Sequence, residues 1–287
     1  MAYGLLGTGL MGLPLAQRLL ATGQPVTVWN RDVTRAQPLE SEGARLAVNP
    51  AEAIATSEVL VLMLVDAAAI EATLLTPEAL AVLPGRLVVQ MGTIAPDESR
   101  AIAARVEAAG GRYLEAPVLG SIPEARSGTL LVMAGGSEAD FAAALPVLRQ
   151  FGQEPRRIGP VGQAMALKLA LNQLIGSLTT GFSASLGLVQ REGVPVEAFM
   201  AILRASALYA PTFDKKLQRM LDRDFERPNF PTRHLLKDMR LFDGAARVQG
   251  LDTAMGEAIE AVLERAIAQG LADLDYSALY EAVDPSR

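Results

Sequence analysis

Two short segments of this sequence have residue types and spacings that suit catalysis and ligand binding. The first, "GTGLMG", follows a short apolar run and leads into a helical pattern. In that context Gly7 permits a tight turn, Gly9 lets the backbone approach a pyrophosphate, and Gly12 lets the helix pack on the strand. A strand–helix turn without ligand is the competing interpretation. The repeated strand–helix context favours a dinucleotide-binding loop made of Gly7, Thr8, Gly9, Leu10, Met11 and Gly12.

The tip of the next predicted strand indicates which dinucleotide is bound. An acid at this point bonds the 2′-hydroxyl of NAD, whereas an arginine accommodates the 2′-phosphate of NADP. Here Asn30 is neutral and Arg31 offers a planar guanidinium to a phosphate. Two alternatives stay open: Asp32 could be the acid displaced by two positions, and Arg31 could be a solvated surface charge. We expect Asn30 and Arg31 to contact the cofactor, with NADP preferred and NAD possible.

The second segment offers a group for proton transfer. A hydride carrier needs a partner that moves a proton to or from a carbonyl oxygen, and the chain has one histidine and no cysteine. Lys168 lies in the apolar stretch "MALKLALNQL", with Asn172 one helical turn further on. Desolvation there lowers the pKa of a lysine toward acid–base values. A lysine snorkelling from an amphipathic helix is the competing interpretation. The position of Lys168 just after an interdomain hinge favours catalysis. Small or polar residues continue the face of the helix that carries Lys168 and Asn172, and we expect this stripe to face the nucleotide domain: Gly176, Thr179 and Ser183.

A third segment, Leu114–Gly136, contains the pair Gly120-Ser121 directly after a predicted strand end. Backbone N–H groups and the Ser121 hydroxyl could form a small anion pocket for a carboxylate. An ordinary Gly-Ser turn explains the same residues equally well, and the residues themselves do not separate the two interpretations.

The elements that position these segments follow two different patterns. In the first 160 residues short β-rich runs alternate with helical stretches such as Leu13–Ala21 and Asp97–Ala109, which predicts a mostly parallel sheet that turns mixed near its end. The strands expected are Tyr3–Leu6, Val26–Trp29, Val59–Val65, Leu87–Gln90, Tyr113–Glu115 and Leu130–Ala134.

After Gly162 the pattern is helical throughout. One helix from Gly162 to Glu192, on the order of 45 Å long, begins this part. The further helices expected are Pro195–Ala205, Pro211–Arg223, Arg233–Gln249 and Thr253–Ala268, and Ile158–Gly162 marks the hinge. The fold class is therefore α/β: a dinucleotide-binding Rossmann domain over residues 1–160 and an all-α substrate and dimerisation domain over 161–287.

Composition excludes several classes of protein. Of the 287 residues half are hydrophobic and 20% are charged, which excludes a disordered or fibrous chain. The net charge of −6 argues against a nucleic-acid partner. A metal site is not expected, because there is no cysteine and His234 is the only histidine. The apolar run "VLVLMLV" is too short to cross a bilayer and the N-terminus does not resemble a signal peptide, so we expect a soluble cytoplasmic protein without membrane contact.

Four blocks in order carry a family resemblance. "GLLGTGLMG" resembles the nucleotide motif, "EAPVLGS" the substrate motif, "GQAMALKLALN" the catalytic motif and "HLLKDMRLF" the C-terminal Lys-Asp motif of the β-hydroxyacid dehydrogenases, relatives of 3-hydroxyisobutyrate and 6-phosphogluconate dehydrogenase. The resemblance spans nearly the whole chain. Within the family the chain is most similar to the NADPH-dependent glyoxylate and succinic semialdehyde reductases.

The resemblance implies roles for further residues. It implies that Lys168 is the catalytic lysine and that Asn172 acts beside it, and it implies a homodimer or homotetramer built through the helical domain. Further cofactor contacts would be Met63, Leu64, Val65, Thr93 and Lys237; substrate contacts would be Leu119, Gly120, Ser121, Phe230 and Asp238.

One residue departs from the family pattern. The substrate motif usually carries a serine where this chain has Leu119, so a hydroxyl that helps bind a substrate carboxylate is missing. We expect NADPH-dependent reduction of a small carboxylate-bearing aldehyde or 2-oxo acid, although a more apolar substrate is an alternative. Further alternatives are a 3-hydroxyisobutyrate-type dehydrogenase working in the oxidative direction and a non-catalytic nucleotide-binding protein. Imine reductases share the scaffold but typically lack the lysine, so Lys168 favours C=O chemistry.

Overall fold

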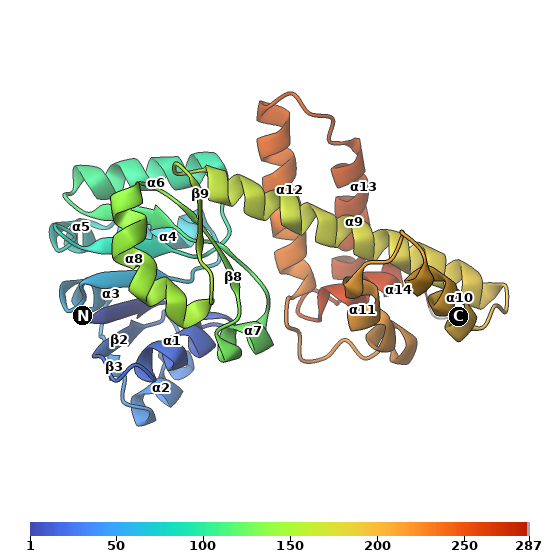
Figure 1. Cartoon of the computed structure of the whole chain (residues 1–287), viewed down its shortest axis with the longest axis horizontal. Helices are drawn as coiled ribbons and strands as arrows, with labels where there is room; N and C mark the ends of the chain where they lie inside the picture. Colours follow the sequence, from blue (N-terminus) through green and yellow to red (C-terminus); the bar gives the residue numbers. More distant parts are fainter. Residues whose placement is uncertain (286–287) are drawn as a thin grey trace. The chain divides into compact units, whose positions relative to one another are not determined.

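The computed structural model describes residues 1–285 and divides into two compact units. The first, Met1–Lys168, contains a sheet with helices on both faces, and the second, from Leu169 on, is helical (Figure 1). The boundary between the units lies inside a single helix, α9 (Gln163–Arg191), which is 29 residues long.

The sheet of the first unit is parallel over its first six strands. Its order is β3-β2-β1-β4-β5-β6-β8-β7, and β9 pairs with β8. The β6–β8 and β7–β8 pairs are antiparallel, so the sheet turns mixed near its end, as the sequence predicts. The strands are β1 Tyr3–Leu6, β2 Val26–Trp29, β3 Arg45–Leu46, β4 Val59–Leu62, β5 Leu87–Gln90, β6 Arg112–Glu115, β7 Val118–Leu119, β8 Leu131–Gly135 and β9 Arg156–Gly159.

Three strands of the structure, β3, β7 and β9, are absent from the prediction because their residues carry no strand pattern. Two of them, β3 and β7, are only two residues long, and β9 begins with two exposed arginines at the sheet edge. The predicted strand Val59–Val65 ends earlier, at Leu62. Its last three residues leave the sheet to form a loop against the glycine segment after β1.

Successive side chains of each strand point to opposite faces of the sheet, and each face has its own apolar core. Leu5, Val61 and Val89 join the core under α1, α2, α7 and α8, while Leu60, Leu62 and Val88 join the core under α3 to α6. The helices are α1 Gly12–Leu20, α2 Gln37–Ser41, α3 Pro50–Ala55, α4 Ala67–Leu74, α5 Pro77–Ala81, α6 Pro96–Ala108, α7 Ile122–Ser127 and α8 Glu138–Phe151. Of these, only α1 and α6 are among the segments named from sequence.

The second unit consists of the rest of α9, four helices whose bounds match the predicted ones within one or two residues, and the short α14, which the sequence analysis does not predict. Two apolar clusters fill it, one around Phe182 and Phe213 and one around Met239 and Ile259. The helices are α10 Val196–Ala205, α11 Pro211–Asp222, α12 Thr232–Val248, α13 Ala254–Ala268 and the short α14 Leu279–Val283. Among the helices of residues 1–285, none combines the length and the apolarity that crossing a membrane requires.

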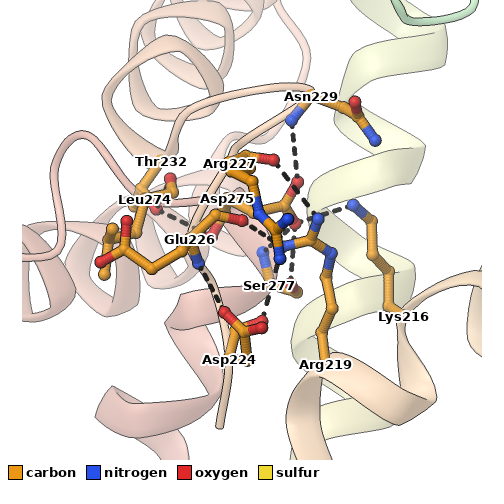
Figure 2. A network of polar contacts seen from close by, with 10 residues as sticks. All are labelled: Lys216, Arg219, Asp224, Glu226, Arg227, Asn229, Thr232, Leu274, Asp275 and Ser277. Atoms are coloured by element: carbon orange, nitrogen blue, oxygen red, sulfur yellow. Dashed lines mark hydrogen bonds and ion pairs between the residues drawn. The ribbon is translucent and has the colours of Figure 1, made fainter. Parts of the chain in front are cut away.

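A buried polar network fixes the segment between α11 and α12 (Figure 2). Lys216 Nζ and Asp275 Oδ1 lie 2.7 Å apart in a pair that is almost inaccessible to solvent. The ammonium also lies 4.2 Å from the centre of the Tyr276 ring. Nearby, Arg219 donates to the main-chain oxygens of Asp224, Glu226 and Arg227. Asn229 N donates to Asp275 Oδ2 at 3.4 Å, so the segment is held against the chain that precedes α14.

The buried pair predicts an acid-labile contribution to stability. Burial by itself raises the pKa of Asp275, but the Lys216 ammonium and the Ser277 donors outweigh it and hold this pKa below the ordinary 3.8. The unfolded chain therefore takes up the proton first as the pH falls. Stability from this carboxylate is complete above its ordinary pKa and is lost as the pH falls through the lower, folded value.

We expect Asp275→Asn to lower the free energy of unfolding by about 3–5 kcal/mol at neutral pH, because it leaves Lys216 buried without a countercharge. The measurement is urea unfolding followed by circular dichroism, with hydrogen exchange of the Asn229 and Ser277 amides as a local probe. Glu264→Gln, which breaks an exposed ion pair with Arg240, is the matched control and should change little. Equal stabilities for Asp275→Asn and the control would contradict this role.

Candidate active site

Five parallel strands of the first unit (β1, β2, β4, β5 and β6) end in one row. Residue pairing joins Leu6 to Trp29 and Leu62, Leu62 to Gln90, and Gln90 to Glu115. The loops after five parallel strands therefore leave from the same edge of the sheet. β2 and β4 flank β1 on opposite sides, so the strand order reverses beside β1, and such a reversal is where open α/β sheets bind their ligands.

The three glycines of the loop after β1 are required for different reasons. Gly7 has a left-handed φ of 99° and packs against the main-chain oxygen of Met63. A Cβ on Gly12 would collide with the main-chain oxygen of Gly7. A Cβ on Gly9, in contrast, would meet no protein atom within 4 Å. The turn and the packing explain Gly7 and Gly12, while the open space above Gly9 fits a ligand that approaches the backbone.

The other residues of this loop differ in exposure. Leu10 is exposed, and Met11 is half-buried at the start of α1. Thr8 is buried, and within residues 1–285 its Oγ1 has no hydrogen-bond partner. An unsatisfied hydroxyl beside an open glycine backbone fits the donor and acceptor needs of a bound phosphate.

At the tip of β2, the two charged residues that could recognise the cofactor ribose, Arg31 and Asp32, have different environments. Asp32 accepts hydrogen bonds from the main-chain N and Oγ1 of Thr34, at 3.1 and 2.6 Å, and so caps the short 3₁₀ turn Val33–Arg35. Asn30 Oδ1 accepts from Thr8 N at 3.0 Å, so the Asn30 side chain holds the glycine loop. Arg31 is exposed and forms no ion pair or hydrogen bond within the described residues. Of the two charged residues, Asp32 is already engaged with Thr34 and Arg35, although it is exposed, whereas Arg31 has no such contact within the described residues.

The loops after β4 and β5 pack backbone against backbone. A Cβ on Gly92 would collide with the main-chain oxygen of Leu64, and the buried Gln90 side chain bonds both N and O of Gly92. Met63 and Leu64 are half-buried, Val65 is exposed, and Thr93 is half-buried just after Gly92. These predicted cofactor contacts thus lie on tightly held loops at the same sheet edge as the glycine loop.

Lys168 and Asn172 lie one turn apart on α9, and both are buried, at 9% and 1% exposure. Asn172 Nδ2 donates to Asp238 Oδ2 at 2.5 Å, and Asp238 Oδ1 pairs with Lys237 Nζ at 3.0 Å. Within the described residues Asn172 Oδ1 is buried without a hydrogen-bond partner. The second unit therefore brings together three predicted site residues, Asn172, Lys237 and Asp238. It leaves Asn172 Oδ1 as an acceptor for which the described chain supplies no donor.

The stripe beyond Asn172 does not have the predicted environment. Gly176 packs against Met239 of α12 and Ile259 of α13 in the same unit, and Thr179 and Ser183 are buried. The prediction that these residues face the nucleotide domain is therefore wrong for Gly176. A Cβ at this position would have to displace the flexible Met239 side chain, so glycine leaves room for the side chains of α12 and α13.

The loop after β7 offers fewer donors than the sequence suggests. Ser121 N and Ser121 Oγ both donate to Glu124 Oε2, at 2.8 and 2.7 Å, and so close the N-terminus of α7. Leu119 is half-buried and pairs with the exposed Leu131 of β8, and Gly120 is exposed. Of the two open interpretations, the turn accounts for Ser121, because both donors that it would bring to an anion pocket are taken by a carboxylate of the chain itself.

Phe230 lies at the end of the segment held by the network of Figure 2. Its ring contacts that of Tyr276, with centroids 5.7 Å apart, and that of His234, at 6.4 Å. Burial, followed by the charges of Arg233 and Lys237, lowers the pKa of His234, which is therefore neutral at physiological pH. Among the described residues no group of three or more His, Cys, Asp or Glu side chains is placed to hold a metal ion.

Sequence reasoning missed Glu115 and Glu124. Glu115 is fully buried, and its Oε1 accepts from Ala164 N and Met165 N at 2.9 and 3.1 Å, in the first turn of α9. A carboxylate as the last residue of the predicted strand Tyr113–Glu115 is a signal for such a contact. Glu124 stands three residues after Ser121, which is the spacing of a capping box.

Comparisons with known proteins show the family of the chain. The model of the NAD-binding domain of 6-phosphogluconate dehydrogenase matches residues 2–169, and that of the NAD-binding region of NADP-dependent 3-hydroxyisobutyrate dehydrogenase matches residues 162–283. The chain is 32% identical to glyoxylate/succinic semialdehyde reductase 1 of Arabidopsis thaliana over the whole of both chains. It is 32% identical to the chloroplastic reductase 2 of that plant, over all of this chain and 80% of the relative. A solved 3-hydroxyisobutyrate dehydrogenase from Salmonella typhimurium is 26% identical, with a TM-score of 0.86 over 98% of this chain and 99% of that one.

The geometry at the tip of β2 predicts a preference for NADPH. We expect Arg31→Ala to raise the KM for NADPH and to leave that for NADH nearly unchanged, because only NADPH carries the 2′-phosphate. Asp32→Asn is the matched control and should leave both constants in place, since Asp32 serves the 3₁₀ turn. The measurement is steady-state kinetics with both cofactors. Equal losses for both cofactors in Arg31→Ala, or a loss for NADH in Asp32→Asn, would refute the assignment.

Proposed function

The chain belongs to the 3-hydroxyisobutyrate dehydrogenase-like β-hydroxyacid dehydrogenases, NAD(P)-dependent oxidoreductases acting on CH–OH and C=O groups, and from this premise we propose that it reduces a small aldehyde or 2-oxo acid with NADPH. Lys168 is the proton donor of this proposal. The relatives named for glyoxylate and succinic semialdehyde support substrates of that type. The observation that carries the mechanism is the buried Lys168 one turn before the Asn172–Asp238 pair.

The surroundings of Lys168 support proton transfer more than a surface role. A snorkelling lysine keeps its ammonium in water, whereas Lys168 is only 9% exposed. NADPH, when bound on the glycine loop, supplies the hydride to the carbonyl carbon. The Lys168 ammonium then gives a proton to the carbonyl oxygen, and in the reverse direction the neutral amine takes it back.

Asn172 orients the reacting groups in this proposal. Its amide nitrogen is fixed by Asp238, which is in turn paired with Lys237. The fixed amide aims Oδ1 as an acceptor that has no partner among the described residues. A substrate hydroxyl or the Lys168 ammonium would satisfy this oxygen, which explains why the asparagine is buried.

The loop Leu119–Glu124 favours a second substrate class. Leu119 brings no hydroxyl, both donors of Ser121 are taken, and Glu124 adds a negative charge. A substrate whose end at this loop is uncharged, such as a hydroxyaldehyde, avoids the repulsion that a carboxylate would meet. This observation favours neutral carbonyl substrates over glyoxylate.

Two other aspects of the function remain proposals. Oxidation of a 3-hydroxyacid uses the same groups in the opposite direction, and a non-catalytic nucleotide-binding role would leave the buried Lys168 and Asn172 unexplained. We also propose a homodimer or homotetramer formed through the helical unit. Exposed leucines on α9, namely Leu174, Leu178 and Leu188, support an interface there.

We expect Lys168→Ala to lower kcat by about 10²–10⁴-fold, the usual contribution of a positioned general acid, with little change in NADPH affinity. Asn172→Ala should cost less, and the double variant should lose less than the product of the two effects. The measurement is stopped-flow hydride transfer beside a direct NADPH titration. Lys215→Ala, an exposed lysine of α11, is the control. Turnover of Lys168→Ala within a few-fold of the wild type would refute the mechanism.

The substrate loop gives a second prediction. We expect Leu119→Ser to raise kcat/KM for glyoxylate by about tenfold or more, because a hydrogen bond to a charged group contributes about 1.5–3 kcal/mol. Glu124→Gln should also raise this constant, because it removes the negative charge that repels a carboxylate while it keeps an acceptor for Ser121. The constant for glycolaldehyde, which has no carboxylate, should change little. The measurement is a steady-state comparison of the two aldehydes. Equal changes for both would show that the loop does not read the carboxylate.

A further inference from the structure

The last residue of β6 is a buried carboxylate that contacts the start of α9. Glu115 Oε1 accepts from Ala164 N and Met165 N, two of the first-turn amides that have no partner within a helix. Glu115 Oε2 accepts from Ser99 Oγ at 2.5 Å, and Ser99 Oγ lies 3.0 Å from Tyr113 OH. Both oxygens of the carboxylate are therefore satisfied by donors, although the residue is inaccessible to water.

The buried charge lies at the electropositive end of a long helix. Aligned peptide dipoles place about half a positive charge at a helix N-terminus, which disfavours a cation in the first turns. Lys168 stands only four residues after Ala164, about 6 Å further along the axis. A carboxylate at the first turn cancels this unfavourable field.

We propose that Glu115 is a positioning residue for the catalytic lysine: it fixes the first turn of α9 at the sheet edge, and its charge keeps Lys168 protonated at working pH. This inference rests on the proposed role of Lys168. It assigns to Glu115 no contact with substrate or cofactor. Because Glu115 sits in the row that also contains Leu6, Leu62 and Gln90, the anchor fixes the lysine-bearing turn relative to the strand that precedes the glycine loop.

Other charged groups along this part of α9 stay in place when Glu115 is changed. Asp238, itself paired with Lys237, bonds Asn172 one turn beyond Lys168. Tyr113 faces Glu115 from the same strand, and burial keeps the pKa of that phenol far above neutrality. On α6, Arg100 lies against Gly162 but is exposed and paired with Asp97. Glu98 bonds Ala95 N and so caps α6 rather than α9. Burial raises the pKa of Glu115, while the donors from Ser99 and α9 oppose that change.

The test is the pH dependence of hydride transfer in Glu115→Gln. Glutamine keeps the shape and an acceptor for the α9 amides, and Ser99 can reverse its hydrogen bond, so the variant should fold. In the reductive direction the rate falls at alkaline pH as Lys168 loses its proton. Removing a unit charge roughly 10 Å away should move this alkaline limb about one pH unit toward neutrality. The KM for the carbonyl substrate should stay unchanged.

Two variants serve as controls. Glu98→Gln removes a similar carboxylate from the start of a different helix and should leave the alkaline limb in place. Ser99→Ala keeps the charge of Glu115 but removes a donor, so it should lower the melting temperature without moving the limb. If Glu115→Gln does not fold, Glu115→Asp retains the charge but reaches less far, and it should lower kcat with the limb unmoved. Wild-type kcat in Glu115→Asp would overturn the positioning role.

The outcomes separate this inference from the proposed function. If Lys168→Ala keeps both the turnover and the alkaline limb of the wild type, the proposed function fails. If Lys168→Ala abolishes the limb but Glu115→Gln leaves it in place, only the inference about Glu115 is overturned. A uniform loss of rate at every pH in Glu115→Gln would reduce Glu115 to a structural residue.

Discussion

A buried carboxylate at the end of β6 fixes where the longest helix of the chain begins. Glu115 bonds the first-turn amides of α9, and the same residue pairs with Gln90 in the sheet. The helix start and the sheet edge are therefore one rigid structure, and Lys168 lies in the second turn of this helix. Because unsatisfied amides and a buried charge are each costly, their mutual contact strongly disfavours any other placement of this turn.

The same edge of the sheet is held together by close backbone contacts. Gly7 packs on Met63, Gly12 on Gly7, and Gly92 on Leu64, so the loops after three strands allow little movement. Against this base the backbone at Gly9 stays open, and Thr8 keeps a hydroxyl without a partner among the described residues. A rigid loop with unsatisfied groups binds phosphate without a cost for ordering the chain.

Most buried polar groups in both units satisfy one another, which makes the exceptions informative. Ser121 donates its hydrogen bond to Glu124, and Lys216 forms an ion pair with Asp275. Asn172 is held by Asp238 through its nitrogen, yet its oxygen has no partner within residues 1–285. Since an unsatisfied buried acceptor is destabilising, its retention beside Lys168 fits a group that a ligand completes. Position in a motif is thus a weaker guide to binding than the state of each hydrogen-bonding atom.

The sequence by itself determined the local features of this protein. Period-two and helical patterns indicate the parallel sheet, the helical second half and α9 within a residue or two, because burial of alternate or every third and fourth side chain is a local property. Strands as short as β7 carry no such pattern. The environment of Gly176 depended on Met239, and the anchoring of α9 depended on Glu115, 49 residues before Ala164. Only the tertiary structure decided these, because hydrogen bonds and packing between distant segments leave no periodic trace in the chain.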